Sequence, residues 1–177
     1  VNKEELDGLG EFQTNEGALA VVQMKPNQAL VPAKDEFSLV LDDIRDPGNL
    51  GTIVRTADCY GVNKILASLE TAEFYNPKVI SASMGSFTRI GIFYTDLAEY
   101  LGKSEHTVFG TFLAGEDVHN ARFGQGGLIV IGNESRGISE GVAAFVSRKI
   151  TIPRYGKAES LNAGIAAAVV LDNLKRH

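Results

Sequence analysis

Short apolar runs alternate with helical patterns along most of the chain. Six runs rich in Val, Ile, Leu and Phe predict β-strands, because their length and β-branched content are typical of buried strands. These runs cover residues 37–43, 63–68, 88–95, 106–112, 128–132 and 149–153. The predicted helices lie near residues 50–60, 77–84, 97–102, 139–146 and 160–176. Apolar strands separated by helices indicate an α/β domain whose mainly parallel sheet is covered by helices, and such sheets bind ligands at the carboxyl ends of their strands.

The first 36 residues have a different composition. They are polar, they are punctuated by Gly and Pro, and they hold one short apolar segment, Ala18–Val22. That segment is too small to form a core of its own, so residues 1–36 are predicted to be a tail and linker. Residues 37–177 are enough for one well-cored domain. Because the chain begins with Val1 and not with methionine, we interpret it as the carboxyl portion of a longer protein.

The composition is that of an ordinary soluble protein, with 44% hydrophobic and 22% charged residues. No apolar run approaches the roughly 20 residues that a membrane helix needs, so we expect no membrane insertion. The single cysteine, Cys59, cannot form an internal disulfide, and the three histidines form no cluster at metal-ligand spacing. A protein of the reducing cytoplasm, without a metal site, is therefore expected.

The net charge of -5 argues, taken alone, against a nucleic-acid partner, because phosphate binding draws on Lys and Arg. The charge is unevenly distributed. Before Pro47 there are ten acids and four bases, a net charge of -6, which leaves +1 for the rest of the chain. Bases gather at Arg148, Lys149, Arg154 and Lys157. This pattern predicts a local basic face, with an ordinary solvated surface as the alternative.

The first candidate site follows the first predicted strand. That strand leads into the turn sequence DPG, and Asn49 comes next, at the start of a helix. A helix cap and a functional role are both open for Asn49. Arg55 lies two turns into the helix among small residues, which leave its guanidinium open to a phosphate or another chain. An ordinary surface cation is the alternative for Arg55.

The second candidate site follows the fifth predicted strand, in the sequence LIVIGNESRG. Gly132 ends the strand and permits the close approach of another backbone or of a ligand. Glu134 follows in a loop bounded by glycines. An ordinary strand-to-helix turn is the alternative, but the position at the carboxyl end of a strand favours a ligand site.

The third candidate site lies in ITIPRYGKAESLNAGIAAAVV, where the last strand leads through a basic glycine turn into the last helix. Ser160 is a residue type that caps helices, and Asn162 falls in the predicted first turn. Since glycine inside a helix costs about 1 kcal/mol relative to alanine, Gly164 predicts the close approach of another group. The alanines around it predict that this helix is tightly enclosed.

Together the three blocks resemble the motifs of the SpoU (TrmH-type) family of RNA ribose 2′-O-methyltransferases, within the SPOUT superfamily. The resemblance runs from about Phe37 to the end and rests on N-L-G-x-I-x-R-T-A from Asn49, I-G-N-E from Ile131, and I-P with S-L-N from Ile152 onward. The family more often has glycine where this chain has Ser135, and Val-Ser where this chain has Ala-Gly after S-L-N. The resemblance implies a C-terminal trefoil knot with S-adenosylmethionine bound among its loops, which connection rules alone would not suggest.

The resemblance also implies roles for individual residues. The residues implied for catalysis and RNA contact are Asn49, Arg55, Glu134, Ser160 and Asn162. The residues implied for contact with S-adenosylmethionine are Thr111, Leu113, Gly132, Ile152 and Leu161. The family arginine at the position of Arg55 is often proposed as a general base, but a guanidinium is effectively always protonated and donates rather than accepts. We therefore expect Arg55 to position an RNA phosphate and to stabilise the developing alkoxide, while the proton leaves through phosphate or water.

The partners implied by the resemblance are RNA and a second copy of the chain. The homodimer is expected to form through the first and last helices of the domain. The apolar residues expected at that interface are Leu50, Ile53, Val54, Val169, Val170 and Leu174. Residues 1–36 are expected to be the remnant and linker of an N-terminal L30e-like RNA-binding domain, because Phe12–Val22 resembles the strand that closes that domain in longer relatives. The chain alone is then expected to bind the cofactor but to methylate RNA poorly.

We expect ribosomal RNA of the large subunit, rather than tRNA, to be the substrate. The tRNA-specific branch of the family carries a basic extension after the last helix, whereas this chain ends at Lys175-Arg176-His177. Three alternatives stay open: a tRNA 2′-O-methyltransferase, a catalytically silent RNA-binding relative and a nucleotide-binding oxidoreductase. The oxidoreductase has the least support, because the sequence GQG is followed by Ile129 where a dinucleotide fingerprint needs glycine.

Overall fold

The computed structural model describes residue 8 and residues 20–176 of the chain. Its centre is a six-stranded sheet in the order β3-β2-β1-β5-β4-β6, in which all neighbouring strands are parallel. The strands are β1 (Phe37–Asp42), β2 (Lys64–Ala67), β3 (Gly91–Tyr94), β4 (Val108–Asp117), β5 (Gly127–Gly132) and β6 (Arg148–Thr151). The predicted parallel α/β sheet is confirmed, and its strands read as continuous apolar runs because both faces are covered.

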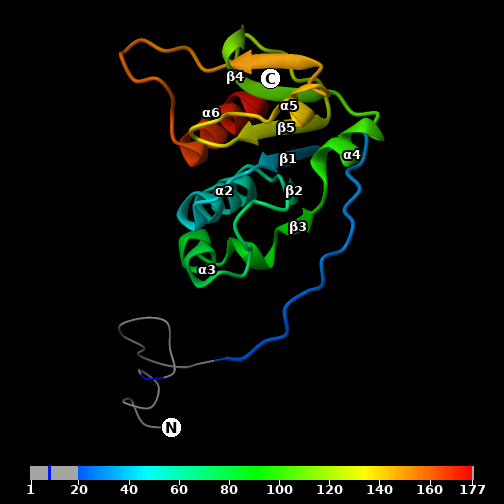
Figure 1. Cartoon of the computed structure of the whole chain (residues 1–177), viewed down its shortest axis with the longest axis vertical. Helices are drawn as coiled ribbons and strands as arrows, with labels where there is room; N and C mark the ends of the chain where they lie inside the picture. The colour runs from blue at the N-terminus through cyan, green and yellow to red at the C-terminus, as the bar shows by residue number, and fades with distance from the viewer. Residues whose placement is uncertain (1–7, 9–19, 177) are drawn as a thin grey trace.

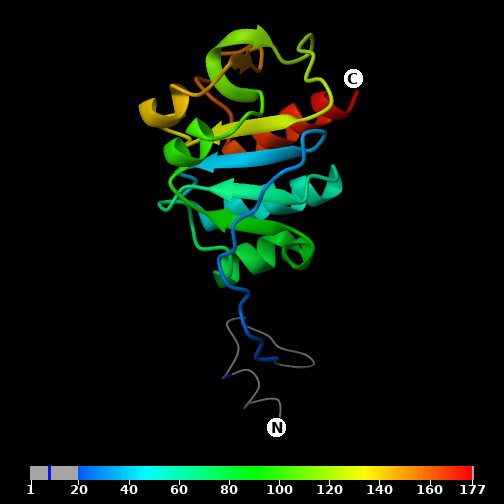
Figure 2. The ribbon, with the colours of Figure 1, turned by 90° about the vertical axis from the view of Figure 1, so that its right-hand side faces the viewer.

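Helices cover both faces of the sheet (Figure 1, Figure 2). They are α2 (Pro47–Cys59), α3 (Pro77–Ser83), α4 (Leu97–Gly102), α5 (Glu140–Ala143) and α6 (Ala163–Arg176), with a 3-10 turn, η1 (Ser86–Thr88). Leu39 and Leu41 of β1 pack into the core formed with α2, α3 and α6, whereas Val40 belongs to the core formed with α4 and α5. Successive strand residues point to opposite faces, so one strand contributes to two separate hydrophobic cores.

Some predicted bounds differ from the observed ones. The third strand begins only at Gly91, because residues 86–88 form the turn η1. The first helix begins earlier than predicted, at Pro47, and the last helix begins later, at Ala163. The ends of these elements depend on turns and on side-chain hydrogen bonds at the caps, which the apolar pattern does not encode.

The segment before β1 is fastened to the domain, and we call residues 27–36 the strap. The side chain of Asn27 donates to the carbonyl of Tyr94 and accepts from its N–H, both at 2.9 Å. These contacts occupy backbone groups at the open edge of β3, an edge strand of the sheet. The hydroxyl of Tyr100 donates to the carbonyl of Leu30 at 2.8 Å. Figure 2 shows the strap lying along the sheet on its way to β1.

Helix α2 packs against α3 and α6 at glycine positions. A Cβ atom added at Gly51 would lie 2.6 Å from the Cβ of Ala82, and one added at Gly164 would lie 3.0 Å from Cγ2 of Thr52. Gly164 therefore has the close neighbour that its place in a helix predicts. The predicted enclosure of α6 is incomplete, since Ile165 on the same helix is 51% exposed.

The apolar residues predicted at a dimer interface belong to the single chain's own core. Of these residues, Leu50, Ile53, Val54 and Val170 are fully buried, Leu174 is 5% exposed and Val169 is half-buried. The prediction of these contact residues is wrong, because the side chains pack on the sheet and are not free for a partner. The exposed positions of α2 are Thr52, Arg55 and Cys59. The homodimer itself stays a prediction.

Several predictions fall beyond what the described residues test. The segment Phe12–Val22 lies largely outside them, and the role of residues 1–36 stays a prediction. The trefoil knot also stays a prediction of the resemblance, and the parallel fold agrees with it. Within residues 20–176, no helix combines the length and the apolar character that crossing a bilayer requires.

Candidate functional site

A cavity of about 1120 Å³ opens at the carboxyl ends of β5 and β6 and beside the middle of β4. Its walls are formed by residues 111–114 of β4 and mainly by the chain segments that follow β5 and β6. All five residues predicted to contact the cofactor lie in its walls: Thr111, Leu113, Gly132, Ile152 and Leu161. The carboxyl ends of parallel strands are where open α/β sheets bind ligands, so the fold favours this cavity as the cofactor site.

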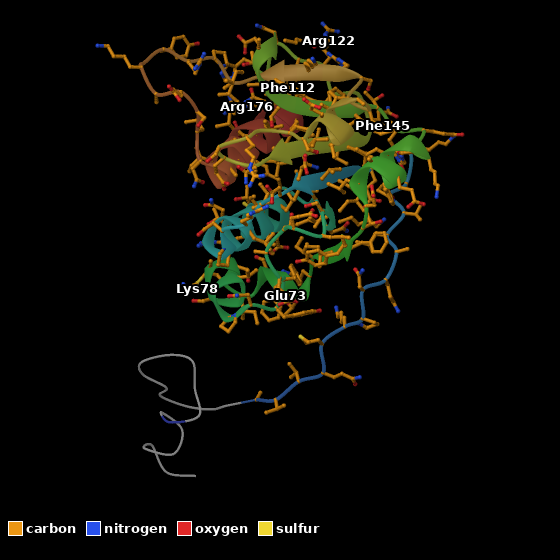
Figure 3. All side chains as sticks on the ribbon, in the orientation of Figure 1. Glu73, Lys78, Phe112, Arg122, Phe145 and Arg176 are labelled. Atoms are coloured by element: carbon orange, nitrogen blue, oxygen red, sulfur yellow. The ribbon has the colours of Figure 1, made fainter. Side chains whose placement is uncertain are left out.

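The wall formed by β4 has an irregular course. Thr111 and Glu116 both pair with the same residue of β6, so residues 112–115 form a bulge in β4 between them. Leu113 lies in this bulge and is 66% exposed. Figure 3 shows the labelled Phe112 at the end of the molecule formed by β4 and β6, opposite the end that carries α3. The longer fourth strand was not predicted, since its second half follows a break in pairing rather than an apolar run.

Gly132 lies where two segments of backbone pass close to each other. A Cβ atom at Gly132 would lie only 2.4 Å from the backbone of Gly137 and Ile138. Asn133 closes the loop between them, because it exchanges two backbone hydrogen bonds with Gly137, and its Oδ1 accepts from the N–H of Ser135 at 2.9 Å. The sequence pattern signalled Gly132 but not Asn133, although Asn is a residue that closes such turns with its own side chain.

Three candidate residues from three separate motifs form one chain of hydrogen bonds. Nδ2 of Asn162 donates to Oδ1 of Asn49 at 2.8 Å, and Nδ2 of Asn49 donates to Oε1 of Glu134 at 2.5 Å. Oδ1 of Asn162 accepts from the N–H of Gly164 at 2.9 Å. Each amide uses both its oxygen and its nitrogen, so its neighbours fix its orientation. Because Glu134 also lines the cavity, this series of hydrogen bonds connects the first and last motifs to the cavity wall.

Two residues considered as helix caps have other roles. Asp46, and not Asn49, caps α2, because its Oδ1 accepts from the N–H of Asn49 at 2.8 Å. Asn162, and not Ser160, binds the free N–H groups at the start of α6. Ser160 is instead exposed in the cavity wall. The side chain of Asn49 is thereby free to reach Glu134.

Arg55 lies apart from the other candidate residues. It is exposed on α2 and is not part of the cavity wall. No other residue within the described part of the chain forms an ion pair with it. Its neighbour one turn earlier on the same helix face is Thr52, which packs near Gly164 of α6. Within the described residues of a single chain, Arg55 therefore forms no ion pair with Glu134 and does not line the cavity.

Two of the four residues of the predicted basic face form side-chain contacts with β4 of the domain. Arg148 of β6 forms an ion pair with Glu116 at 2.5 Å, and Lys149 lies 4.9 Å from the centroid of the Phe112 ring. These contacts tie two of the predicted basic residues to β4. The two others, Arg154 and Lys157, lie exposed on the loop between β6 and α6.

The cavity suits a nucleoside-sized cofactor. Its volume is slightly above the range for small-molecule sites, about 300–1,000 Å³. Its walls combine apolar side chains, such as Ile152 and Leu161, with the polar groups of Ser160 and Glu134. Small-molecule sites typically have this mixture, in which a few polar groups orient a mainly apolar contact. Among the residues that the structure describes, no group of three His, Cys, Asp or Glu side chains is placed to hold a metal ion.

The fold and the cavity define an α/β protein with a cofactor-type site at the carboxyl edge of a parallel sheet. The model of the SpoU rRNA Methylase family matches residues 36–172, and the chain belongs to this family. The resemblance found in the three motifs is thereby confirmed.

Individual relatives extend this comparison. The chain is 30% identical over 179 residues to the 23S rRNA (guanosine(2553)-2′-O)-methyltransferase RlmP of Bacillus subtilis, covering 99% of this chain and 71% of that protein. The SpoU methyltransferase AviRb of Streptomyces viridochromogenes, solved in complex with AdoMet, is 28% identical with a TM-score of 0.85 and covers 99% of this chain and 71% of its own. A structure concerned with 2-OH methylation of C/U34 on tRNA is 28% identical with a TM-score of 0.72, over 80% of this chain and 95% of that one.

Four curated relatives are longer than the chain. The chain spans between 57% and 71% of the length of four curated relatives that it matches. What the relatives do as whole proteins therefore bears on this chain only as a basis for a proposal.

Proposed function

We propose that the chain is the methyltransferase part of an S-adenosylmethionine-dependent RNA 2′-O-methyltransferase. The observation that carries this proposal is the chain of hydrogen bonds from Asn162 through Asn49 to Glu134, beside a cavity of cofactor size. Three motifs that are far apart in sequence meet there. Family membership supports the reaction class, and the AdoMet complex of AviRb supports the cofactor.

Methyl transfer to a ribose hydroxyl needs aligned reactants, removal of a proton and stabilisation of the growing negative charge. When bound, S-adenosylmethionine supplies an electrophilic methyl group on its sulfonium. We assign its binding to Thr111, Leu113, Gly132, Ile152 and Leu161. Asn49 fixes Oε1 of Glu134, so that the second carboxylate oxygen is available to accept from a ribose hydroxyl. Ser160 on the same wall is exposed and available to bind the sugar.

We assign Arg55 to an RNA phosphate and to the developing alkoxide, because a guanidinium donates hydrogen bonds and keeps its charge. Arg55 lies away from the cavity of its own chain. The arginine that serves a given site therefore comes from a second copy of the chain in this proposal. A homodimer that contacts through the exposed surfaces of α2 and α6, which include Thr52 and Ile165, would supply it.

The substrate that we propose is ribosomal RNA of the large subunit, as for the Bacillus subtilis relative. Residues 1–36 would link the methyltransferase domain to an N-terminal L30e-like domain that supplies the remaining RNA contacts. Transfer RNA is the second candidate, favoured by the tRNA-related structure of which this chain covers 95%. An RNA substrate and an exposed single cysteine suit the reducing cytoplasm.

Two measurements test the proposal. Titration calorimetry is expected to detect binding of S-adenosylmethionine and none of NADH, which separates a methyltransferase from an oxidoreductase. Ribose methylation by the full-length protein is then mapped on deproteinised ribosomal RNA and on total tRNA from a strain that lacks the gene. Label in the large-subunit RNA supports the proposal, and label confined to tRNA supports the second candidate. Cofactor binding without methylation of either RNA would favour a silent relative.

A further inference from the structure

The loop between β6 and α6 carries an aromatic side chain that the described residues leave uncovered. Tyr155 is 92% exposed, and Figure 1 shows the loop reaching out from the sheet before it returns to α6. An exposed apolar side chain is common in itself, so its position decides its meaning. Tyr155 lies in the wall of the cavity, on the same loop as Ser160 and Leu161.

The loop that carries Tyr155 contains an internal hydrogen bond. Nη1 of Arg154 donates to the carbonyl of Glu159 at 2.9 Å, which joins the two arms of the loop around Tyr155. Pro153 precedes Arg154 and restricts the backbone at the start of the loop. Tyr155 is thus displayed at a defined place beside the cavity, and a tyrosine has only two side-chain torsions to order on binding.

Most of the charged residues near Tyr155 in the sequence are positive. Residues 148–157 contain four bases and no acid, in a chain with a net charge of -5, and the acid that follows them on the loop is Glu159. Arg154 and Lys157 flank Tyr155, and neither takes part in an ion pair within the described residues. An aromatic side chain between exposed cations is the pattern by which proteins bind single-stranded nucleic acids, since the ring stacks on a base and the cations meet phosphates.

We propose that Tyr155 stacks on a nucleobase of the RNA substrate, while Arg154 and Lys157 contact the neighbouring phosphates. This inference rests on the proposed function. A ribose that reaches Glu134 at the cavity has to leave a regular RNA helix, and its unstacked base or that of its neighbour needs a new surface. Every base has a π-face, so Tyr155 would hold the nucleotide without selecting the base. A second copy of the chain is a less suitable partner for this loop than RNA, because a symmetric contact between two such loops would bring their positive charges together.

The test uses the protein and a short single-stranded RNA that carries 2-aminopurine, whose fluorescence falls when the base stacks. The unaltered protein is expected to quench the probe. Tyr155→Ala is expected to lose the quenching and to raise the KM for RNA about tenfold, with unchanged affinity for S-adenosylmethionine, whereas Tyr155→Phe retains both properties. Leu69→Ala is the matched control, since it removes another side chain that is 67% exposed, beyond the end of β2, and it is expected to change neither.

The possible outcomes separate this inference from the proposed function. Unchanged quenching and KM in an active Tyr155→Ala variant overturn the inference and leave the proposed function standing. Weakened binding of S-adenosylmethionine by Tyr155→Ala would assign Tyr155 to the cofactor site. A shift from dimer to monomer mass would assign it to a contact with a second copy of the chain. Either result overturns the inference. A complete lack of RNA methylation by the unaltered full-length protein contradicts the proposed function itself.

Discussion

Nδ2 of Asn49 lies 2.5 Å from Oε1 of Glu134, although 85 positions separate the two residues in sequence. The contact depends on the sheet, because β1 and β5 are parallel neighbours and the segments that follow them meet at the same edge. Asp46 caps α2 in place of Asn49, which leaves the amide of Asn49 free for this bond. The geometry of the proposed reaction site thus depends on strand order as much as on the motifs.

Replacing Asn49 with alanine tests this contact. Asn49→Ala is expected to lower kcat for methyl transfer about a hundredfold. The substitution leaves the Glu134 carboxylate unfixed, and a small displacement of a reacting group lowers the rate on this scale. The free energy of unfolding should fall by only about 1 kcal/mol, since the lost hydrogen bonds are partly exposed. Glu134→Gln is the companion variant, because it keeps the oxygen that accepts from Asn49 but removes the charge. Equal activity of Asn49→Ala and the unaltered protein would show that the contact has no catalytic role.

The close backbone approach at Gly132 should not tolerate a side chain. Gly132→Ala places a Cβ atom 2.4 Å from the backbone of Gly137 and Ile138 and is expected to lower the free energy of unfolding by about 3 kcal/mol. Gly141→Ala is the control, because its nearest neighbour would be 3.8 Å away, and it should change stability by less than about 1 kcal/mol. Chemical denaturation measures both variants. A Gly132→Ala variant as stable as the control would contradict the observed loop path.

The crossing of α2 and α6 should show coupling between Gly164 and Thr52. A Cβ atom at Gly164 would lie 3.0 Å from Cγ2 of Thr52, whereas serine at position 52 lacks that methyl group but keeps a hydroxyl for the carbonyl of Gly48. Gly164→Ala is therefore expected to be more favourable in the Thr52→Ser background, by about 1 kcal/mol in a double-mutant cycle of unfolding free energies. Additive effects of the two substitutions would mean that the helices do not meet at these atoms.

The strap should protect the edge of β3. Asn27→Ala removes two hydrogen bonds to the backbone of Tyr94 and is expected to cost about 1–2 kcal/mol of stability. Hydrogen exchange at the Tyr94 amide should accelerate in the variant, because its acceptor is lost. Gln28→Ala, at the next exposed position of the strap, provides the control and should leave that amide protected. Unchanged exchange at Tyr94 in Asn27→Ala would show that another group covers the edge.

The contribution of the strap should also depend on pH. Partial burial disfavours the charge of Glu36, but hydrogen bonds from Lys64 and from the N–H of Ala33 outweigh it and hold the pKa of Glu36 below its usual range. A carboxylate with a lowered pKa stabilises the fold above the unfolded-state value, about 4.3, and this stabilisation is lost as the pH falls through the folded-state pKa.

Glu36→Gln is the variant that tests this dependence. It is expected to be less stable than the unaltered protein by about 1 kcal/mol at pH 7, where the ion pair with Lys64 is complete. The difference should shrink as the pH falls below the unfolded-state value, about 4.3, and through the lowered folded-state pKa of Glu36. Thermal unfolding over this pH range measures it. A difference that stays constant into acid would mean that the charge of Glu36 is not what stabilises the strap.

The apolar runs of the sequence were sufficient to predict the parallel sheet, whereas the family was predicted from its resemblance to the three motifs. Leu39, Val40 and Leu41 form an apolar run because both faces of β1 are covered. The prediction of the dimer contact residues was wrong for the same reason. Residues such as Leu50 and Ile53 are apolar in either case, so the sequence does not distinguish packing on their own sheet from packing on a partner. An apolar side chain is predicted to be buried, but its sequence position does not predict whether its own chain or a partner covers it.

The polar contacts were harder to predict from sequence. Asp46 and Asn49 are both residue types that cap helices, and only three-dimensional geometry determines which one binds the first free N–H groups. The same holds for Ser160 and Asn162 at α6. The separation of Arg55 from the cavity had no signal in the sequence, because it depends on which face of α2 packs against the sheet.

The most direct test of the proposed reaction is the chemical identity of the methylated nucleoside. Ribosomal RNA is incubated with the protein and with S-adenosylmethionine that carries a trideuterated methyl group, then digested to nucleosides and analysed by mass spectrometry. We predict that the deuterated methyl group is found on the ribose 2′-oxygen, and that Asn49→Ala and Glu134→Gln greatly reduce it. A deuterated methyl group on a base, or equal labelling by both variants, would contradict the assignment of this site to ribose methylation.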